Sequence, residues 1–456
     1  MTEALKNNRM KIGVGVLLLS FALLVSHTDG ILLTNWAKMF WDCVLAGRCF
    51  EYSDYVKELG YWPINYSIFL TMVNAIWMAP VYFLDYFLPI AFHDYIFQAW
   101  MKLLILFAVL LCAYVMYQLF LLRKVDASRA ACYVLLFLIC GTVLHGNVGD
   151  GQEDCWDALF LFLSLYYMQK KDYTKLSLAG GMLMVCKGRG LLFFIPIFLL
   201  LFGKELKNLV KHALLMLVPY VISFFLTHVV FFHYAKNSAE MNAQWHNIWR
   251  LFDPKIGDIP LFLGIYGVVC IICWSRAIRG CVKEWDYVLY PLIILFAYVA
   301  FLNWTSYWLI YPMVFVFEAM EELKNRDDAM LAFTGFNIGY YAYVFTHHVG
   351  SDDNVMFNFG ILSMTGHGEV YRNYMGIIND LMPDMYVVLP SAATAVVAGF
   401  ALYLVIAYAR DVVWQKSLGY ENVVQVRTYW TTIFVVVNVL IPVLYLVTGL
   451  LIYFRG

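Results

Sequence analysis

Apolar residues occur in long runs separated by short polar stretches, and these runs are long enough to cross a membrane. The first run covers about 11–28, within the roughly 20 residues that a transmembrane helix needs. Later runs lie at about 99–122, 127–145, 155–169, 174–203, 208–232, 258–275, 285–303, 305–322, 329–348, 385–409 and 428–453. We therefore predict an all-α polytopic membrane protein with about thirteen transmembrane helices, the run 174–203 counting twice.

Basic residues between the runs predict which side of the membrane each loop occupies. Short loops rich in Lys and Arg stay in the cytoplasm, so Lys6 to Lys11 assign the N-terminus to that side. The first span then ends outside at Asp29. If both 66–91 and 99–122 crossed, Arg123 would lie outside. We therefore predict that 66–91, broken by two prolines and Asp85, forms juxtamembrane or re-entrant helices of an outer loop 29–98.

The run 174–203 contains the polar break Lys187-Gly188-Arg189-Gly190. One straight helix of this length would extend about 45 Å, well beyond a hydrocarbon core of about 30 Å. Both flanks of the run are also basic. Two short spans that meet at Lys187 and Arg189 on the outer face satisfy both constraints.

The composition is typical of a membrane protein and limits the classes of binding partner that we expect. Hydrophobic residues make up 62% of the chain and charged residues only 14%, against roughly a quarter in soluble domains. The net charge of −1 gives no indication of nucleic acid binding. Cys43 and Cys49 lie in the first outer loop, and whether they form a disulfide stays open.

Three sets of polar groups are predicted to meet on the outer side. They are Asp29, a cluster of acidic residues between two spans, and the cations Lys187 and Arg189. The acidic cluster contains Asp150, Glu153, Asp154 and Asp157. Ionisable residues at membrane depth are costly and indicate a functional site. Two cations beside glycines suit a phosphate, whereas snorkelling of Lys187 and Arg189 to lipid headgroups is the structural alternative.

A metal ion is an open alternative for the acidic cluster. Glu153, Asp154 or Asp157 together with Asp29 would offer the oxygen ligands that Mg²⁺ or Mn²⁺ prefers, but nothing in their spacing demands a metal. His347-His348 with Asp352-Asp353 is a weak second candidate. Aromatic and basic residues near 245 and 307 either line a cavity or anchor the chain at the interface; they are Trp245, His233, His246, Arg250, Trp304, Tyr307 and Trp308.

The order of these motifs resembles the GT-C superfamily of membrane glycosyltransferases, and most closely the branch of protein O-mannosyltransferases and the lipid A aminoarabinose transferase. In that branch an Asp follows the first span, as Asp29 does, and a helix then ends at a small residue, as Asn35–Gly47 does. An aromatic Pro motif follows, here Tyr61-Trp62-Pro63-Ile64-Asn65-Tyr66. Asp157 at the head of the fourth span and Lys187-Gly188 complete the match, which covers about 10–205.

This resemblance implies an inverting transfer from a polyprenyl-phosphate sugar to a hydroxyl of a glycan, lipid or protein acceptor. Asp29 would be the general base, Lys187 and Arg189 would bind the donor phosphate, and 66–91 with Tyr61, Trp62 and Tyr66 would form the prenyl groove. The expected location is a bacterial plasma membrane with the site on the extracytoplasmic face. Three departures from the pattern are Gly30 in place of a second acid, Trp62-Pro63 in place of two prolines, and Arg189 in place of Pro.

Two organisational units are predicted, with other functions left open. Residues 1–205 would form the GT-C-like catalytic module, and 206–456 a variable transmembrane region with outer loops 233–257 and 349–384. The alternatives are a transporter or flippase of lipid-linked glycans and an oligosaccharide polymerase that uses the loop 349–384. A purely structural membrane partner is disfavoured by the cost of the charges within the membrane.

Overall fold

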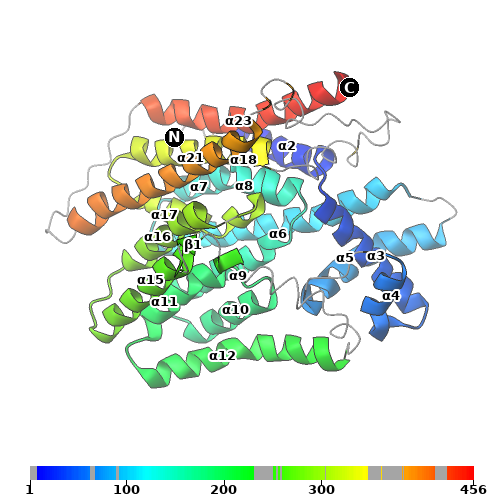
Figure 1. The fold of residues 1–456 in the computed structure, drawn as a ribbon, viewed down its shortest axis with the longest axis horizontal. Coiled ribbons are helices and arrows are strands. Elements are labelled where there is room, and N and C mark those ends of the chain that lie inside the picture. Colours follow the sequence, from blue (N-terminus) through cyan, green and yellow to red (C-terminus); the bar gives the residue numbers. More distant parts are fainter. Residues whose placement is uncertain are drawn as a thin grey trace.

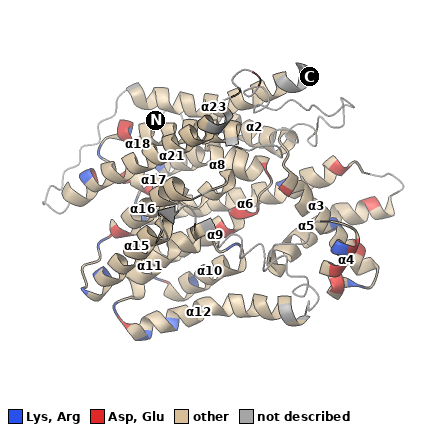
Figure 2. Cartoon of the chain, viewed as in Figure 1, with Lys and Arg blue, Asp and Glu red and all other residues tan. Residues whose placement is uncertain are grey.

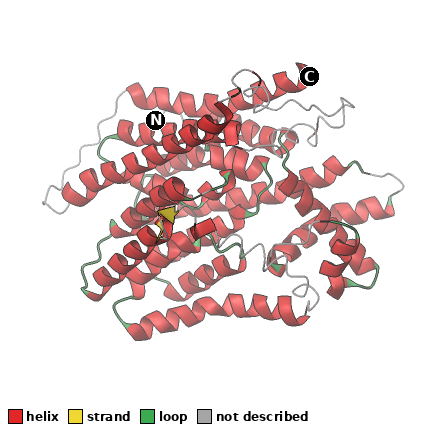
Figure 3. Ribbon diagram, viewed as in Figure 1, coloured by secondary structure: helices red, strands yellow, loops and turns green. Residues whose placement is uncertain are grey.

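The computed structural model describes residues 8–61, 67–88, 92–230, 250–252, 255–256, 259–302, 304–347, 361, 380, 383, 385–415 and 429–455. These residues are almost all helical, as predicted (Figures 1 and 3). The exception is a short antiparallel pair in which Lys255 of β1 (Lys255–Ile256) is opposite Pro260 of β2 (Ile259–Pro260). The all-α fold class is therefore confirmed.

The N-terminal helices begin with two that are joined at a sharp bend. The first half of the described chain contains α2 (Asn8–Leu24), α3 (Thr28–Leu45), η1 (Cys49–Glu51), α4 (Tyr52–Glu58), α5 (Ile68–Phe87), α6 (Asp94–Leu122), α7 (Ala127–Ile139), α8 (Gly141–Val143), η2 (Leu144–Gly149), α9 (Asp154–Gln169), α10 (Tyr173–Val185) and α11 (Leu191–Phe202). The second half contains α12 (Leu206–Phe225), η3 (Leu226–Val230), η4 (Arg250–Phe252), α15 (Leu261–Ile278), α16 (Asp286–Phe301), η5 (Ser306–Ile310), α17 (Met313–Glu322), α18 (Arg326–His347), α21 (Met385–Tyr408), η7 (Ala409–Trp414) and α23 (Tyr429–Arg455).

Within this described part, six helices are long and apolar enough to cross a membrane, or eight if each of two bent pairs counts as one span. The protein is therefore membrane-embedded, but the predicted thirteen spans are not confirmed. The difference arises because several apolar runs fold as shorter pieces. The run 305–322 forms the short η5 and then the ten-residue α17, and the helices on either side of Lys187 have 13 and 12 residues.

Helices α3, α4 and α5 pack beside the main bundle, on the right in Figure 1. Small apolar cores form around Trp36, Tyr52 and Met78, and the core around Met78 also includes side chains of α6. Figure 2 shows acidic and basic residues together around α4, where Arg48 pairs with Glu51 and Glu58. Cys43 and Cys49 are both free thiols in this structure, so the disulfide that the sequence left undecided is not formed.

Two of the expected breaks within 66–91, Pro80 and Asp85, do not interrupt α5, and the third, Pro89, lies outside the described residues. The helix packs against α3 and α6. The indoles of Trp77 and Trp100 each donate to the other's backbone carbonyl, at 2.8 and 2.6 Å, and the two rings stack. The helix α5 is also long and apolar enough to span a membrane, so its predicted juxtamembrane position stays a prediction.

Three interruptions of apolar runs shape the site. The break of 174–203 at residues 186–190 is confirmed. The other two were not expected: α2 and α3 meet at 71°, and α7 meets the helical segment Gly141–Gly149 at 56°. The bend between α2 and α3 precedes Asp29, the segment Gly141–Gly149 leads into the acidic cluster, and the break at 186–190 contains Lys187.

A single large apolar core joins both halves of the chain, from Val14 to Leu446. In Figure 1 α12 lies along one edge of the molecule and α23 along the opposite edge. The short η5 packs against α8, η2 and α9 of the first half. The division into units 1–205 and 206–456 remains a prediction, since the second unit also supplies side chains to the site described next.

Candidate functional site

Asp29 lies in the first turn of α3, not at the outer end of α2 as the sequence predicts. The chain leaves helical geometry at His27, whose Nδ1 accepts the Asp29 N–H at 3.0 Å and so caps α3. Backbone N–H groups at a helix N-terminus favour a carboxylate there. The Asp29 side chain keeps 33% of its surface exposed, which leaves it accessible to a substrate.

The turn at residues 150–152 packs directly against the start of α3. Gln152 Nε2 donates to Asp29 Oδ2 at 2.6 Å. A Cβ on residue 30 would lie 3.0 Å from the Asp150 carbonyl oxygen, and Gly151 has a φ of +68°. A side chain at position 30 would therefore crowd the Asp150 carbonyl, which favours glycine there.

The four acids of the predicted cluster are buried, each at most 1% exposed, so they do not form a solvated loop. Each of the four acids has its own hydrogen-bonding or ion-pair partners. Asp150 lies 3.6 Å from His145 and accepts a hydrogen bond from Ser306, while Glu153 accepts one from Asn74 of α5. Asp157 accepts the Gly190 N–H at 3.0 Å. Burial raises the pKa of Glu153 to about 7 and that of Asp150 to about 6.

Asp154 binds both predicted phosphate-binding cations. Lys187 Nζ lies 2.6 Å from its Oδ2 and Arg189 NH1 lies 3.1 Å from its Oδ1, and Tyr311 also donates to Oδ1. Burial of the Lys187 ammonium opposes its charge, but the Asp154 carboxylate outweighs that effect, and the pKa of Lys187 is raised. Gly188, with a φ of +74°, makes the turn that brings the two cations to one carboxylate. Snorkelling outward does not describe side chains that are only 10% and 15% exposed.

Aromatic residues of η5 cover the cations. The Arg189 guanidinium carbon lies 3.8 Å from the Trp308 ring centroid, and Lys187 Nζ lies 5.7 Å from that of Tyr307. Trp304 is buried and stacks on Tyr343. Trp304 and Trp308 are therefore buried around the site, and Tyr307 is half-buried there. His233, Trp245 and His246 fall outside the described residues, as do His348, Asp352 and Asp353, and the side chains of Arg250 and His347 are likewise not described.

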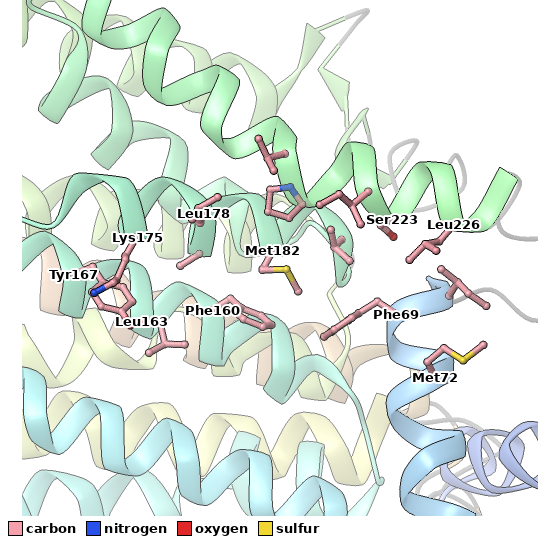
Figure 4. Close-up of a pocket in the computed structure, with 16 residues that line it drawn as sticks. Phe69, Met72, Phe160, Leu163, Tyr167, Lys175, Leu178, Met182, Ser223 and Leu226 are labelled. Atoms are coloured by element: carbon pink, nitrogen blue, oxygen red, sulfur yellow. The ribbon is translucent and has the colours of Figure 1, made fainter. Parts of the chain in front are cut away.

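An apolar groove of about 780 Å³ lies beside α10, the helix that ends just before the cation pair in the chain (Figure 4). Its walls come from α5, α9, α10 and α12, and Val185, two residues before Lys187, lies at one end of the α10 wall. The lining residues are Ile68, Phe69, Met72, Phe160, Leu163, Tyr167, Lys175, Leu178, Ala179, Met182, Val185, Val218, Pro219, Ile222, Ser223 and Leu226. Tyr61 is exposed and does not line this groove, and Trp62 and Tyr66 fall outside the described residues.

The acids do not fit a shared divalent cation. In the described part of the chain no three His, Cys, Asp or Glu side chains are grouped to hold a metal ion. Asp154 is taken by two cations and a tyrosine hydroxyl, and Asp29 by an amide N–H.

Comparison with protein-family models, curated proteins and solved structures finds no match to this chain. The assignment of the candidate site therefore depends on its geometry alone. The sequence pattern missed Gln152, Asn74 and Tyr311. Gln152 stands beside the flagged acids, but a glutamine gives no signal of its partner, and Asn74 and Tyr311 reach the cluster only through packing of distant helices.

Buried Glu153 predicts a pH-dependent stability. The folded state favours its protonated form, so this residue costs no stability below its unfolded pKa of about 4.5, and stability is lost as pH rises through about 7. Glu153→Gln keeps an acceptor for Asn74 and cannot ionise. We expect its melting temperature, relative to the wild type, to rise between about pH 4.5 and 7 and to level off above that. Thermal melts of detergent-purified protein across this range would measure it, and a difference that is constant with pH would contradict the prediction.

Proposed function

We propose that this chain is a membrane glycosyltransferase that moves a sugar from a polyprenyl-phosphate donor to an acceptor hydroxyl. Asp29 acts as general base, and the reaction takes place at the extracytoplasmic face of a bacterial plasma membrane. The proposed arrangement is GT-C-like, with about thirteen spans and the N-terminus in the cytoplasm. The motif order described for residues 10–205 supports this assignment by analogy.

One observation carries the proposal. A partly exposed carboxylate and a buried cation pair lie around one aromatic residue, and an apolar groove is lined by α10, the helix that immediately precedes the cation pair in the chain. Tyr307 is the aromatic residue: Lys187 Nζ lies 5.7 Å from its ring centroid, and Asp29 and Arg189 are near enough to influence its hydroxyl electrostatically. A lipid-linked sugar phosphate has the same three parts: an apolar chain, an anion and a reacting carbon.

The charge balance of the cation pair favours a phosphodiester donor. Lys187 and Arg189 carry two positive charges and Asp154 one negative charge, so these three residues hold one positive charge in excess. A prenyl-phosphate sugar carries one negative charge, whereas a pyrophosphate-linked sugar carries two. During transfer a second negative charge develops on the leaving phosphate, where preorganised cations in a dry site stabilise it most.

The reaction follows from these positions. The acceptor oxygen attacks the anomeric carbon and gives its proton to Asp29. The bond between the anomeric carbon and the phosphate oxygen breaks, and the phosphate leaves with the electron pair, facing Lys187 and Arg189. Attack opposite the leaving group inverts the anomeric centre. A phosphate is a good leaving group, so no general acid is needed.

The first test is an activity assay with purified protein and a panel of polyprenyl-phosphate sugars, scored for transfer or donor hydrolysis. We expect turnover with one or more prenyl-linked donors and none with the same sugar phosphates lacking the chain. Movement of intact lipid-linked glycan across liposomes, without transfer, would support the transporter alternative. A polymerase would lengthen a lipid-linked glycan, and its predicted loop 349–384 lies almost wholly outside the described residues.

The groove makes a separate prediction with a matched control. Ile222 and Val221 are neighbours on α12 with similar exposure, 56% and 58%, but only Ile222 lines the groove. Ile222→Trp should obstruct the prenyl chain and raise the donor KM about tenfold or more, since several buried methylenes lose contact. Val221→Trp should leave donor KM unchanged. Equal effects of the two substitutions would show that the groove does not bind the chain.

A further inference from the structure

We propose that Gln152 is the positioning residue of Asp29. Gln152 is fully buried, and its Nε2 lies 2.6 Å from Asp29 Oδ2. A carboxylate can only accept, so the amide nitrogen must face it. The proposal rests on the proposed function, since it assigns the proton-accepting role to Asp29.

The backbone around Gln152 is fixed from several sides. Its N–H donates to the Asn147 carbonyl at 3.0 Å, and its carbonyl accepts from Cys155 Sγ at 3.4 Å. Asn147 is itself held by the Thr142 carbonyl at 2.6 Å. Gly30 and Gly151 let the two backbones approach closely, because a Cβ on Gly151 would lie 3.4 Å from the Gly30 Cα. The amide therefore reaches Asp29 from a rigid turn.

The consequence for Asp29 is a fixed orientation. Contacts between the described residues and this carboxylate fall on Oδ2: the Gln152 amide at 2.6 Å and His27 Nδ1 at 3.8 Å. Gln152 thus turns Oδ1 toward the acceptor hydroxyl. A neutral donor also stabilises the ionised base, whereas a second carboxylate at this distance would compete for its proton.

Other charged or titratable groups around Asp29 come from each element packed against it. His27 precedes it, Asp150 lies on the adjoining turn, Tyr307 lies on η5, and Lys102 of α6 donates to the Val25 carbonyl. All four are unchanged in the variants below. Differences between the variants therefore report the Gln152 contact.

Two variants test the proposal through turnover and through chemical labelling. Gln152→Leu removes the donor, and we expect kcat to fall about 10- to 100-fold with donor KM unchanged, the size expected for one hydrogen bond to a charged group. Gln152→Glu keeps the shape but adds a like charge. A hydrophobic carbodiimide modifies protonated carboxyl groups, and mass spectrometry can follow its reaction at Asp29. We expect the pH of half-maximal labelling to rise by about one unit or more in Gln152→Glu.

The two readouts separate the possible failures. If both variants keep the wild-type kcat and the wild-type labelling profile, Gln152 does not position Asp29. If the wild type turns over no donor, the proposed function fails, and the labelling profile still decides whether Gln152 and Asp29 interact. A melting curve for each variant identifies loss of fold, and the near-isosteric Gln152→Glu provides the test if Gln152→Leu does not fold.

Discussion

Asp29→Asn should lower transfer by about 10²–10⁴-fold, the usual contribution of a general base, while donor binding stays intact. The substitution keeps the size of the side chain and an oxygen that accepts from Gln152, so the start of α3 should not move. The His27 cap bonds to the backbone N–H and is unaffected. The measurement is the transfer rate at saturating donor, together with donor affinity.

Asp94→Asn is the matched control. Asp94 also lies in the first turn of a helix capped by a histidine, since His93 Nδ1 accepts the Tyr95 N–H at 3.2 Å. Its side chain is 79% exposed and pairs with Lys38, away from the cation pair. Its rate should match the wild type. A near-full rate in Asp29→Asn would show that another group accepts the proton.

Asp154→Ala should be the most destabilising substitution in the site. Removal of this fully buried carboxylate leaves Lys187 and Arg189 close together without their shared counter-charge, and loss of one partner from a buried pair costs about 3–5 kcal/mol. Tyr311 also loses its acceptor. The melting temperature in detergent should fall clearly, and any folded fraction should bind donor weakly because the cations are no longer fixed.

An exposed ion pair gives the comparison. Glu58→Ala removes one of the two carboxylate partners of Arg48 at the surface of α4, and its melting temperature should stay near that of the wild type. A double variant, Asp154→Ala with Lys187→Ala, should recover part of the stability lost in Asp154→Ala, because it removes one uncompensated charge. Equal melting temperatures for Asp154→Ala and the wild type would mean that the cations have other adequate partners.

The general character of the fold could be predicted from the local pattern of the chain. Apolar runs predict helices in a membrane because every backbone polar group must be satisfied within the helix. The break at Lys187 was also predictable, since an apolar run of that length with basic residues at both ends and in the middle cannot form one span. The same local pattern could not give the number of spans, because it does not show that Cys140 ends α7 or that η5 replaces part of a long helix.

For the candidate site, too, the sequence determines some features and the tertiary structure determines the others. The sequence by itself determined which ionisable groups an apolar chain retains at helix breaks: Asp29, the four acids, Lys187 and Arg189. Only the tertiary structure decided their roles. It left Asp29 partly exposed, paired both cations with Asp154 and buried the other acids. It also brought Gln152 beside Asp29 and Tyr307 beside Lys187, although the members of each pair are more than a hundred residues apart in the chain. Burial and charge pairing depend on distances between helices, and a pattern along the chain does not contain those distances.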